Sequence, residues 1–185
     1  MSAQQPYLAT NIGERRRLFV CSAVAVLVFI VNEAEKILLL AHPRRKGMWE
    51  VVNGSLEAEE TLLAAALRET REEVGPDVRV RPLGAVHAYT FHFDENVPYM
   101  LSLGYLMAYE GGAIQPGDDM RDSQFRWWNL EEMAEASVQI IVPPNQKWLM
   151  QRAVELYRLW KEQTVELQPE LSFTAKNKYQ QFTSE

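Results

Sequence analysis

The segment from Gly54 to Gly75, GSLEAEETLLAAALRETREEVG, places the strongest constraint on what this chain can fold into. Glu69, Glu72 and Glu73 are spaced i, i+3 and i+4, so a helix would bring three carboxylates onto one face within about one turn. Like charges at this spacing repel each other by roughly 0.2–0.5 kcal/mol per close pair. A hard divalent cation would turn that repulsion into ligation, because Mg²⁺ binds carboxylate oxygens and keeps waters for a phosphate-bearing substrate.

Three glutamates on a helix are, by themselves, more often a solvated face than a metal site. The wider spacing favours the metal site: Gly54, five residues, Glu60, seven residues, Arg68-Glu69, two residues, Glu72-Glu73, one residue and Gly75. This constellation resembles the signature box of the Nudix hydrolase family, which reads G, five residues, E, seven residues, R-E-U-x-E-E-x-G-U, with U aliphatic. Chance agreement at the seven fixed positions is on the order of 10⁻⁸ to 10⁻⁹ at average residue usage.

The box from Gly54 to Pro76 departs from the family pattern in a few places. Thr70 and Pro76 occupy the aliphatic positions, Glu59 stands where glycine is frequent, and Asn53 replaces the glycine that usually precedes Gly54. Asparagine tolerates left-handed backbone angles better than most residues, and it still has a backbone carbonyl to offer a metal. We therefore expect a working site with altered loop detail.

The resemblance implies an α/β fold, a Nudix-type α/β/α sandwich with a mixed β-sheet, here with an added C-terminal helix. It also implies hydrolysis of a nucleoside diphosphate linked to another group X, with Mg²⁺ or Mn²⁺ as cofactor. By position in the box, the metal ligands would be Glu69, Glu72, Glu73 and the carbonyl of Asn53. Glu69 is the candidate general base and Arg68 the candidate orienting residue, while Gly54, Glu60 and Gly75 would support the site.

Candidate substrate residues lie outside the box. Arg44 and Arg45 belong to a basic loop that would suit extra phosphates, and Trp49 would suit stacking on a base, although ordinary surface and core roles are more common for such residues. His87 and Tyr89 would share one face of an alternating strand in the part of the chain where this family often places substrate contacts. Asp119 and Asp122 are the candidates for a downstream acid, with ordinary solvated loop acids at least as common.

Composition limits the class of protein and its partners. With 185 residues and 47% hydrophobic content, the chain suits one globular domain with a sizeable core. A net charge of −6 argues against duplex nucleic acid and anionic membranes as partners, but not against a nucleotide-type small molecule whose phosphates are bridged by metal. The single cysteine, Cys21, suggests an inert thiol in the reducing cytoplasm. The apolar run 18–31 follows three arginines but is valine-rich and too short to span a bilayer, so a buried strand is favoured over a signal sequence.

The order of expected elements completes the analysis. Residues 1–17 are expected to form an irregular loose arm or a dimer-contacting segment. Residues 18–167 are expected to form the Nudix domain with its C-terminal helix, and residues 168–185 a polar tail. Strands are expected at 18–31, 36–42, 49–52, 78–82, 83–93, 99–109 and 125–128, the box helix at about 60–74, and the last helix at about 145–167. Asn129 is expected to cap a short helix. Trp148, Leu149, Leu156, Tyr157 and Trp160 are expected to form the apolar face of the last helix, and a homodimer is a reasonable expectation.

Two other functions remain open at this stage. A catalytically silent Nudix domain would bind a nucleotide as a sensor or scaffold, but it has no physical need for so dense a set of carboxylates. An isomerase on the same fold would need a second acid–base pair facing the substrate, and Cys21 offers no obvious nucleophile. Metal-dependent hydrolysis is therefore the leading hypothesis.

Overall fold

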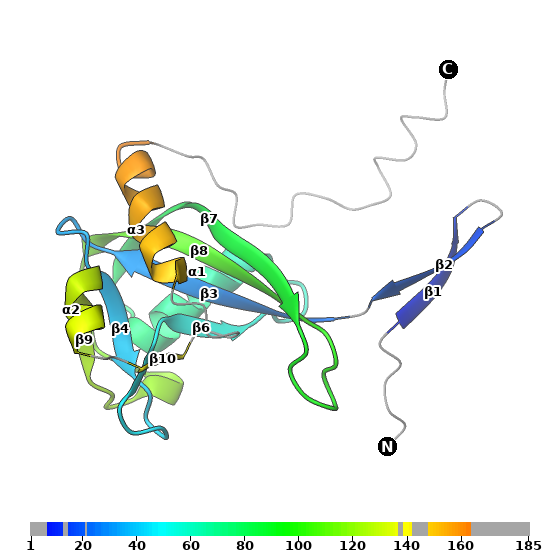
Figure 1. Cartoon of the computed structure of the whole chain (residues 1–185), viewed down its shortest axis with the longest axis horizontal. Helices are drawn as coiled ribbons and strands as arrows, with labels where there is room; N and C mark the ends of the chain where they lie inside the picture. Colours follow the sequence, from blue (N-terminus) through cyan, green and yellow to red (C-terminus); the bar gives the residue numbers. More distant parts are fainter. Residues whose placement is uncertain (1–6, 13–14, 21, 137–138, 142–147, 164–185) are drawn as a thin grey trace.

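A computed structural model describes residues 7–12, 15–20, 22–136, 139–141 and 148–163. Its centre is an eight-stranded mixed sheet with the order β10-β5-β4-β3-β8-β7, in which β6 also pairs with β3 and β9 with β4 (Figure 1). The strands of this sheet are β3 (Ala23–Val31), β4 (Ile37–Ala41), β5 (Met48–Glu50), β6 (Val52–Ser55), β7 (Arg79–Phe91), β8 (Met100–Gly111), β9 (Phe125–Trp128) and β10 (Gln139–Ile141). β3 is its middle, because it pairs in parallel with β8 and antiparallel with β4 and β6.

Helices cover both faces of this sheet. The long helices are α1 (Leu62–Val74) and α3 (Trp148–Trp160), and the short ones are the 3₁₀ helix η1 (Asp118–Met120) and α2 (Leu130–Glu135). One core cluster joins Leu27, Phe29 and Val31 of β3 to the buried residues of α3, and the other joins Val26, Val28 and Ile30 to those of α1. Alternate residues of one apolar strand thus serve opposite cores, as the pleat requires. The predicted α/β/α arrangement with a C-terminal helix is confirmed.

The box helix α1 forms where the sequence places it. Thr61 is its N-cap, and the Thr61 hydroxyl accepts a hydrogen bond from the Ala64 N–H. Gly75 ends the helix with φ 128°, a conformation that side chains disfavour, and its N–H still bonds the Arg71 carbonyl. Thr70 stands at an aliphatic position of the box and is nevertheless buried, since its hydroxyl donates to the Ala66 carbonyl at 2.7 Å.

Several predicted strands need correction. The expected strand over 18–31 is two strands, because β3 starts only at Ala23 and Leu18 belongs to the earlier strand β2 (Arg15–Val20). β2 pairs with β1 (Tyr7–Ile12) in a hairpin that stands apart from the main sheet in Figure 1, so the prediction of an irregular arm over 1–17 is wrong for these residues. The expected strands 78–82 and 83–93 are the single strand β7, which passes Pro82 and Gly84 by a register shift. Cys21 lies outside the described residues.

The end of the described chain differs in extent from the prediction. The last helix is α3, shorter than the expected 145–167, and residues 142–147 and 164–185 lie outside the described part, including the predicted tail over 168–185. Leu149 and Tyr157 are buried as expected, but Trp148 is 46% exposed. The prediction for Trp148 was wrong, because the buried face of α3 consists of Leu149, Met150, Ala153, Val154 and Tyr157. The β9 strand over 125–128 and the Asn129 cap are confirmed, the cap as a reciprocal bond pair with Glu132.

Candidate active site

A cleft of about 510 Å³ opens between α1, strand β6 and the loop that joins β4 to β5. Its lining comes from α1, β6, the η1 turn, the end of β5 and the loop between β4 and β5. Its lining residues are His42, Pro43, Arg44, Glu50, Asn53, Gly54, Ser55, Glu57, Arg68, Glu69, Glu72, Glu73, Asp118, Asp119 and Met120. The structure therefore brings together the predicted metal ligands Asn53, Glu69, Glu72 and Glu73, with Arg68 and Gly54 among them.

Arg68 is the hub of the α1 side of the cleft. Its Nη1 lies 2.7 Å from Glu69 Oε1 and 2.9 Å from Glu72 Oε2, and its Nε lies 3.0 Å from Glu60 Oε1. Its Nη2 donates to Glu60 Oε2 at 3.1 Å and to the Ser55 carbonyl at 2.9 Å. The carboxylates hold the pKa of Arg68 above its ordinary range, with Glu60 as the main cause. The i, i+4 pair with Glu72 is thus one part of a larger network.

Gly54 has a steric reason to lack a side chain. Asn53 and Gly54 were expected in a loop, but they lie in strand β6, where Gly54 pairs with Val26 of β3. The carboxylate of Glu69 lies directly against Gly54, so that a Cβ at this position would overlap it. The close approach of α1 to β6 at this point therefore depends on glycine.

Asn53 ties the same strand to Glu73. Its backbone N–H donates to Glu73 Oε2 at 3.1 Å, and its side-chain amide donates to Glu50 Oε2 at 3.3 Å and to the Val51 carbonyl at 3.1 Å. In an antiparallel strand the N–H and C=O of one residue point to the same edge. The Asn53 carbonyl therefore faces the edge where Glu73 lies, the position from which the resemblance has it meet a metal.

Burial gives the cleft carboxylates unequal acidities. Burial raises the pKa of Glu73 to about 8, and the nearby charges of Glu69, Glu50 and Asp119 add to this shift against the opposing Asn53 N–H. Burial also raises the pKa of Glu69, where Arg68 opposes it. The Arg68 hydrogen bond instead lowers the pKa of the Glu60 carboxyl. A negative charge on Glu73 is therefore costly in this cleft unless a proton or a cation accompanies it.

Sequence reasoning missed Glu50. This carboxylate is only 8% exposed, lines the cleft from the end of β5, and has its pKa raised by burial. A lone acidic residue in the apolar segment Trp49-Glu50-Val51-Val52 is the sequence signal that could have found it, since charged residues are seldom buried without a partner. Its partner is the Asn53 amide.

The oxygen atoms of the cleft have the chemistry that a divalent ion needs. Its oxygens are the hard ligands that Mg²⁺ and Mn²⁺ prefer, and the negative charge gathered around Glu73 suits a cation. Within the described ranges, no three His, Cys, Asp or Glu side chains are already grouped around one point as ligands. Two of the candidates, Glu69 and Glu72, point toward the Arg68 guanidinium instead. The residues fit such an ion in chemistry and location, with Arg68 as the present counter-ion.

The acidic turn η1 borders the cleft beside the C-terminal end of α1. Asp119 lines the cleft together with Asp118, whereas Asp122 is exposed and does not line it. The turn is held against α1 by backbone bonds from the Gln115 N–H to the Val74 carbonyl and from the Gly117 N–H to the Glu73 carbonyl. Of the two candidate downstream acids, Asp119 is therefore the one that the fold brings to the cleft.

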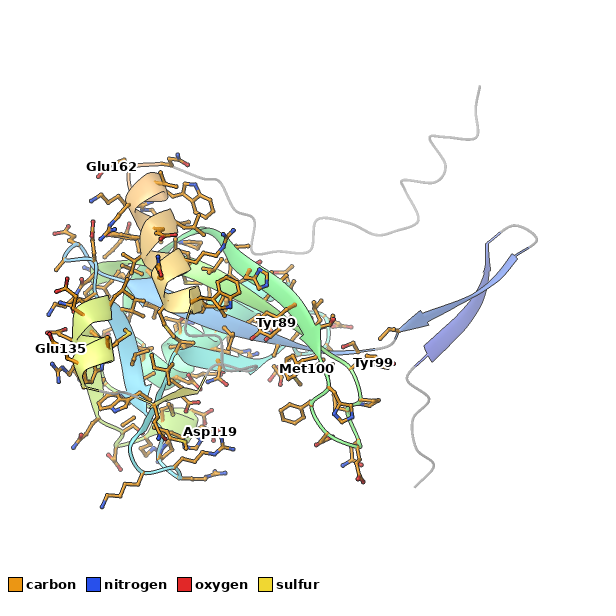
Figure 2. All side chains as sticks on the ribbon, viewed as in Figure 1. Tyr89, Tyr99, Met100, Asp119, Glu135 and Glu162 are labelled. Atoms are coloured by element: carbon orange, nitrogen blue, oxygen red, sulfur yellow. The ribbon has the colours of Figure 1, made fainter. Side chains whose placement is uncertain are left out.

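The other predicted substrate residues divide between the cleft and more distant places. Arg44 lines the cleft and Arg45 does not, while Trp49 packs edge-to-face on Trp128 and borders a separate groove with Phe125 and Arg126. His87 and Tyr89 stack at 5.7 Å on β7, and the strands β3 and β8 lie between them and Asn53 of β6. Figure 2 shows Tyr89 well apart from Asp119. Tyr89 continues into Phe91 and Phe93, and His87 contacts Trp148 of α3. We call His87, Tyr89, Phe91 and Phe93 the aromatic row.

A known protein family matches most of this chain. The NUDIX domain family matches residues 22–152. The chain belongs to this family and is a Nudix hydrolase domain, which confirms the interpretation of the box. In the part of the chain that the structure describes, no helix is long and apolar enough to cross a membrane.

The chain is similar to individual proteins of this family in sequence and in fold. The chain is 34% identical over 133 residues to the NAD-capped RNA hydrolase NudC of Vibrio atlanticus, covering 70% of this chain and 46% of NudC. It thus spans about half the length of the curated relatives it matches. Its fold is similar to that of an ADP-ribose pyrophosphatase from Streptococcus suis, with TM-score 0.60, 17% identity and coverage of 79% and 97% of the two chains. It is also similar to a bifunctional NMN adenylyltransferase/ADP-ribose pyrophosphatase from Francisella tularensis in complex with AMP and a Mn ion, with TM-score 0.53, 17% identity and coverage of 71% and 40%.

Proposed function

We propose that this chain hydrolyses the pyrophosphate bond of a nucleoside diphosphate linked to a group X, with Mg²⁺ or Mn²⁺ as cofactor. The observation that supports this most is the convergence of the box carboxylates on one cleft, where Glu73 is buried among Glu50, Glu69 and Asp119. A domain that only bound nucleotide would have no physical use for this concentration of buried charge. We therefore favour the enzyme over the silent nucleotide-binding domain.

The proposed metal ligands are Glu69, Glu72, Glu73 and the Asn53 carbonyl, with Asp119 as the acid on the η1 turn. A bound ion would supply charge neutralisation for the phosphates and a lower pKa for the attacking water. Glu69 is the proposed general base, since it borders the cleft and is held at one oxygen by Arg68. Arg68 is proposed as a positioning residue, because all three of its nitrogens already bond to the protein.

The relatives support a proposal for the substrate class. NudC carries NAD-capped RNA in its name, so we propose that X is a second nucleoside, as in NAD or NADH. His87 and Tyr89, which belong to the aromatic row, are proposed to contact X, because planar rings stack favourably on aromatic side chains. An RNA with such a 5′ end is compatible with the net charge of −6, which argues only against duplex binding. We further propose a cytoplasmic location, where such substrates occur, and a homodimer.

Product identification tests the proposed reaction. Purified protein with Mg²⁺ is incubated with nucleoside triphosphates, ADP-ribose, NAD, NADH, nucleotide sugars, dinucleoside polyphosphates and an NAD-capped RNA, beside the Glu73→Gln variant. Cleavage by the wild type alone, with mononucleotide products from NAD or NADH, is the expected result. No cleavage, with nucleotide binding detected by calorimetry, would replace this proposal with the binding domain.

A further inference from the structure

The side of the cleft opposite α1 is formed by the loop that joins β4 to β5. Backbone bonds close this loop, from the His42 N–H to the Met48 carbonyl at 2.8 Å and from the Met48 N–H to the Arg45 carbonyl at 3.0 Å. His42, Pro43 and Arg44 of this loop line the cleft. The loop side of the cleft therefore carries an imidazole and a guanidinium, close to the Glu50 carboxylate at the end of β5.

The loop fixes the protonation pattern of His42. The Arg44 backbone N–H donates to His42 Nδ1 at 3.0 Å, so Nδ1 must be the acceptor nitrogen. A neutral imidazole that accepts at Nδ1 carries its proton on Nε2. Within the described residues, Nε2 has no hydrogen-bond partner. His42 thus presents a fixed and unused N–H donor at the edge of the cleft.

Phosphate oxygens in this cleft need donors, and few are available. Arg68 has none to spare, because its Nε, Nη1 and Nη2 atoms are shared among Glu60, Glu69, Glu72 and the Ser55 carbonyl. The guanidinium of Arg44 forms no ion pair with any residue that the structure describes. The donors left for a substrate on the loop side are therefore His42 Nε2 and the side chain of Arg44.

We propose that His42 is a substrate-binding residue whose Nε2–H donates a hydrogen bond to a non-bridging phosphate oxygen of the nucleoside diphosphate, with the Arg44 guanidinium adding charge beside it. This inference rests on the proposed function and names a contact that the box does not contain. It also gives the 42–47 loop a role, because the loop holds the imidazole by its Nδ1 atom in the lining of the cleft. The phosphates would then be gripped from both sides of the cleft.

Two substitutions separate this contact from loop support. His42→Gln places an amide N–H near the position of Nε2 but removes the acceptor for Arg44. His42→Asn keeps an acceptor oxygen near the position of Nδ1 but has no group at Nε2. ADP binding is measured by calorimetry with and without Mg²⁺, and kcat and KM are measured for the substrate found in the panel. Thermal melting checks that each variant is folded.

The expected result is that His42→Asn weakens ADP binding and raises KM by roughly 10–100-fold, the usual loss for a hydrogen bond to a charged group, while His42→Gln stays within a few-fold of wild type. Lys46→Ala removes one positive charge from the same loop outside the cleft and should leave both readouts unchanged. The reverse order of the two variants, an equal loss in both, or no loss in either would overturn the proposal. A wild type that cleaves nothing but binds ADP would reject the enzyme, while the ADP measurements would still decide the role of His42.

Discussion

Two helices of equal length cover opposite faces of the same sheet, and they bury different chemistry. α1 and α3 each contain 13 residues. The buried side chains of α3 are apolar except for the Tyr157 hydroxyl, whereas α1 buries Glu69, Thr70 and Glu73 beside Leu63 and its alanines. Both helices are amphipathic, but only α1 has carboxyl groups among its buried side chains.

This difference separates packing from function. Burying a carboxylate lowers stability unless it is paired or neutral, so a helix selected for stability alone would resemble α3. α1 instead uses the small side chains Ala65 and Ala66 against the sheet, and it lies close enough for Glu69 to contact Gly54. We infer that α3 contributes mainly to the stability of the domain and α1 mainly to its chemistry. Four experiments test this division between the two helices.

The largest effect is expected from Glu73→Gln in α1. Removing this carboxylate should lower kcat by about 100-fold or more at saturating Mg²⁺, because a proposed metal ligand and the most buried charge of the cleft are lost together. The melting temperature of the metal-free protein should stay the same or rise, because no charge is left to bury. Turnover equal to wild type with Mg²⁺ at saturation would rule out this role for Glu73.

Leu149→Ala in α3 should produce the opposite pattern. Leu149 is 1% exposed, and truncating a buried leucine to alanine lowers the free energy of unfolding by about 2–5 kcal/mol. The value of kcat/KM, measured well below the melting temperature, should stay close to wild type, because α3 does not line the cleft. Denaturant titration and steady-state kinetics on the same preparation measure both. A large loss of kcat with unchanged stability would contradict the division between the helices.

The pH dependence of stability should report the buried charge of α1. Because the pKa of Glu73 is raised to about 8 from an ordinary 4.5, the folded state keeps a proton that the unfolded chain releases between these values. The metal-free protein should therefore lose stability as pH rises from about 4.5 to 8, by a few kcal/mol at most. Melting curves across this range should show the decline, and Glu73→Gln should remove its largest part. A wild-type slope equal to that of the variant would place the pKa of Glu73 near its ordinary value.

The smallest effect is expected on the outer face of α3. Leu159 is 67% exposed, and Leu159→Ser should change the free energy of unfolding by no more than about 0.5 kcal/mol. Its activity should also match wild type, which makes it the control for Leu149→Ala. A marked change in melting temperature that depends on protein concentration would show instead that this face is buried between two copies.

The box and its helix could be predicted because their signals are local. The spacing of the carboxylates and the end of the helix at Gly75 are set by residues close together in the sequence. The same holds for the β9 strand and the Asn129 cap. The cleft could be predicted only in part, because its other residues arrive through pairing across the sheet. Glu50 and His42 reach it from strand ends, and whether Asp119 or Asp122 does so depends on one turn of η1. The pairing of β1 with β2 was missed because their apolar residues do not alternate with polar ones as in a half-buried strand, and three consecutive arginines open β2.

Arg68 bears on the order in which this domain folds and receives its ion. In a metal-nucleated fold the ligands repel one another until the ion arrives, so the empty chain stays unfolded. Here one guanidinium already bridges Glu60, Glu69 and Glu72, while the raised pKa of Glu73 lets it keep its proton. Each of these four carboxylates thus has a counter-charge or a proton within the protein itself. We expect the chain to reach its native state without any ion and to take one up later, as a separate and reversible event.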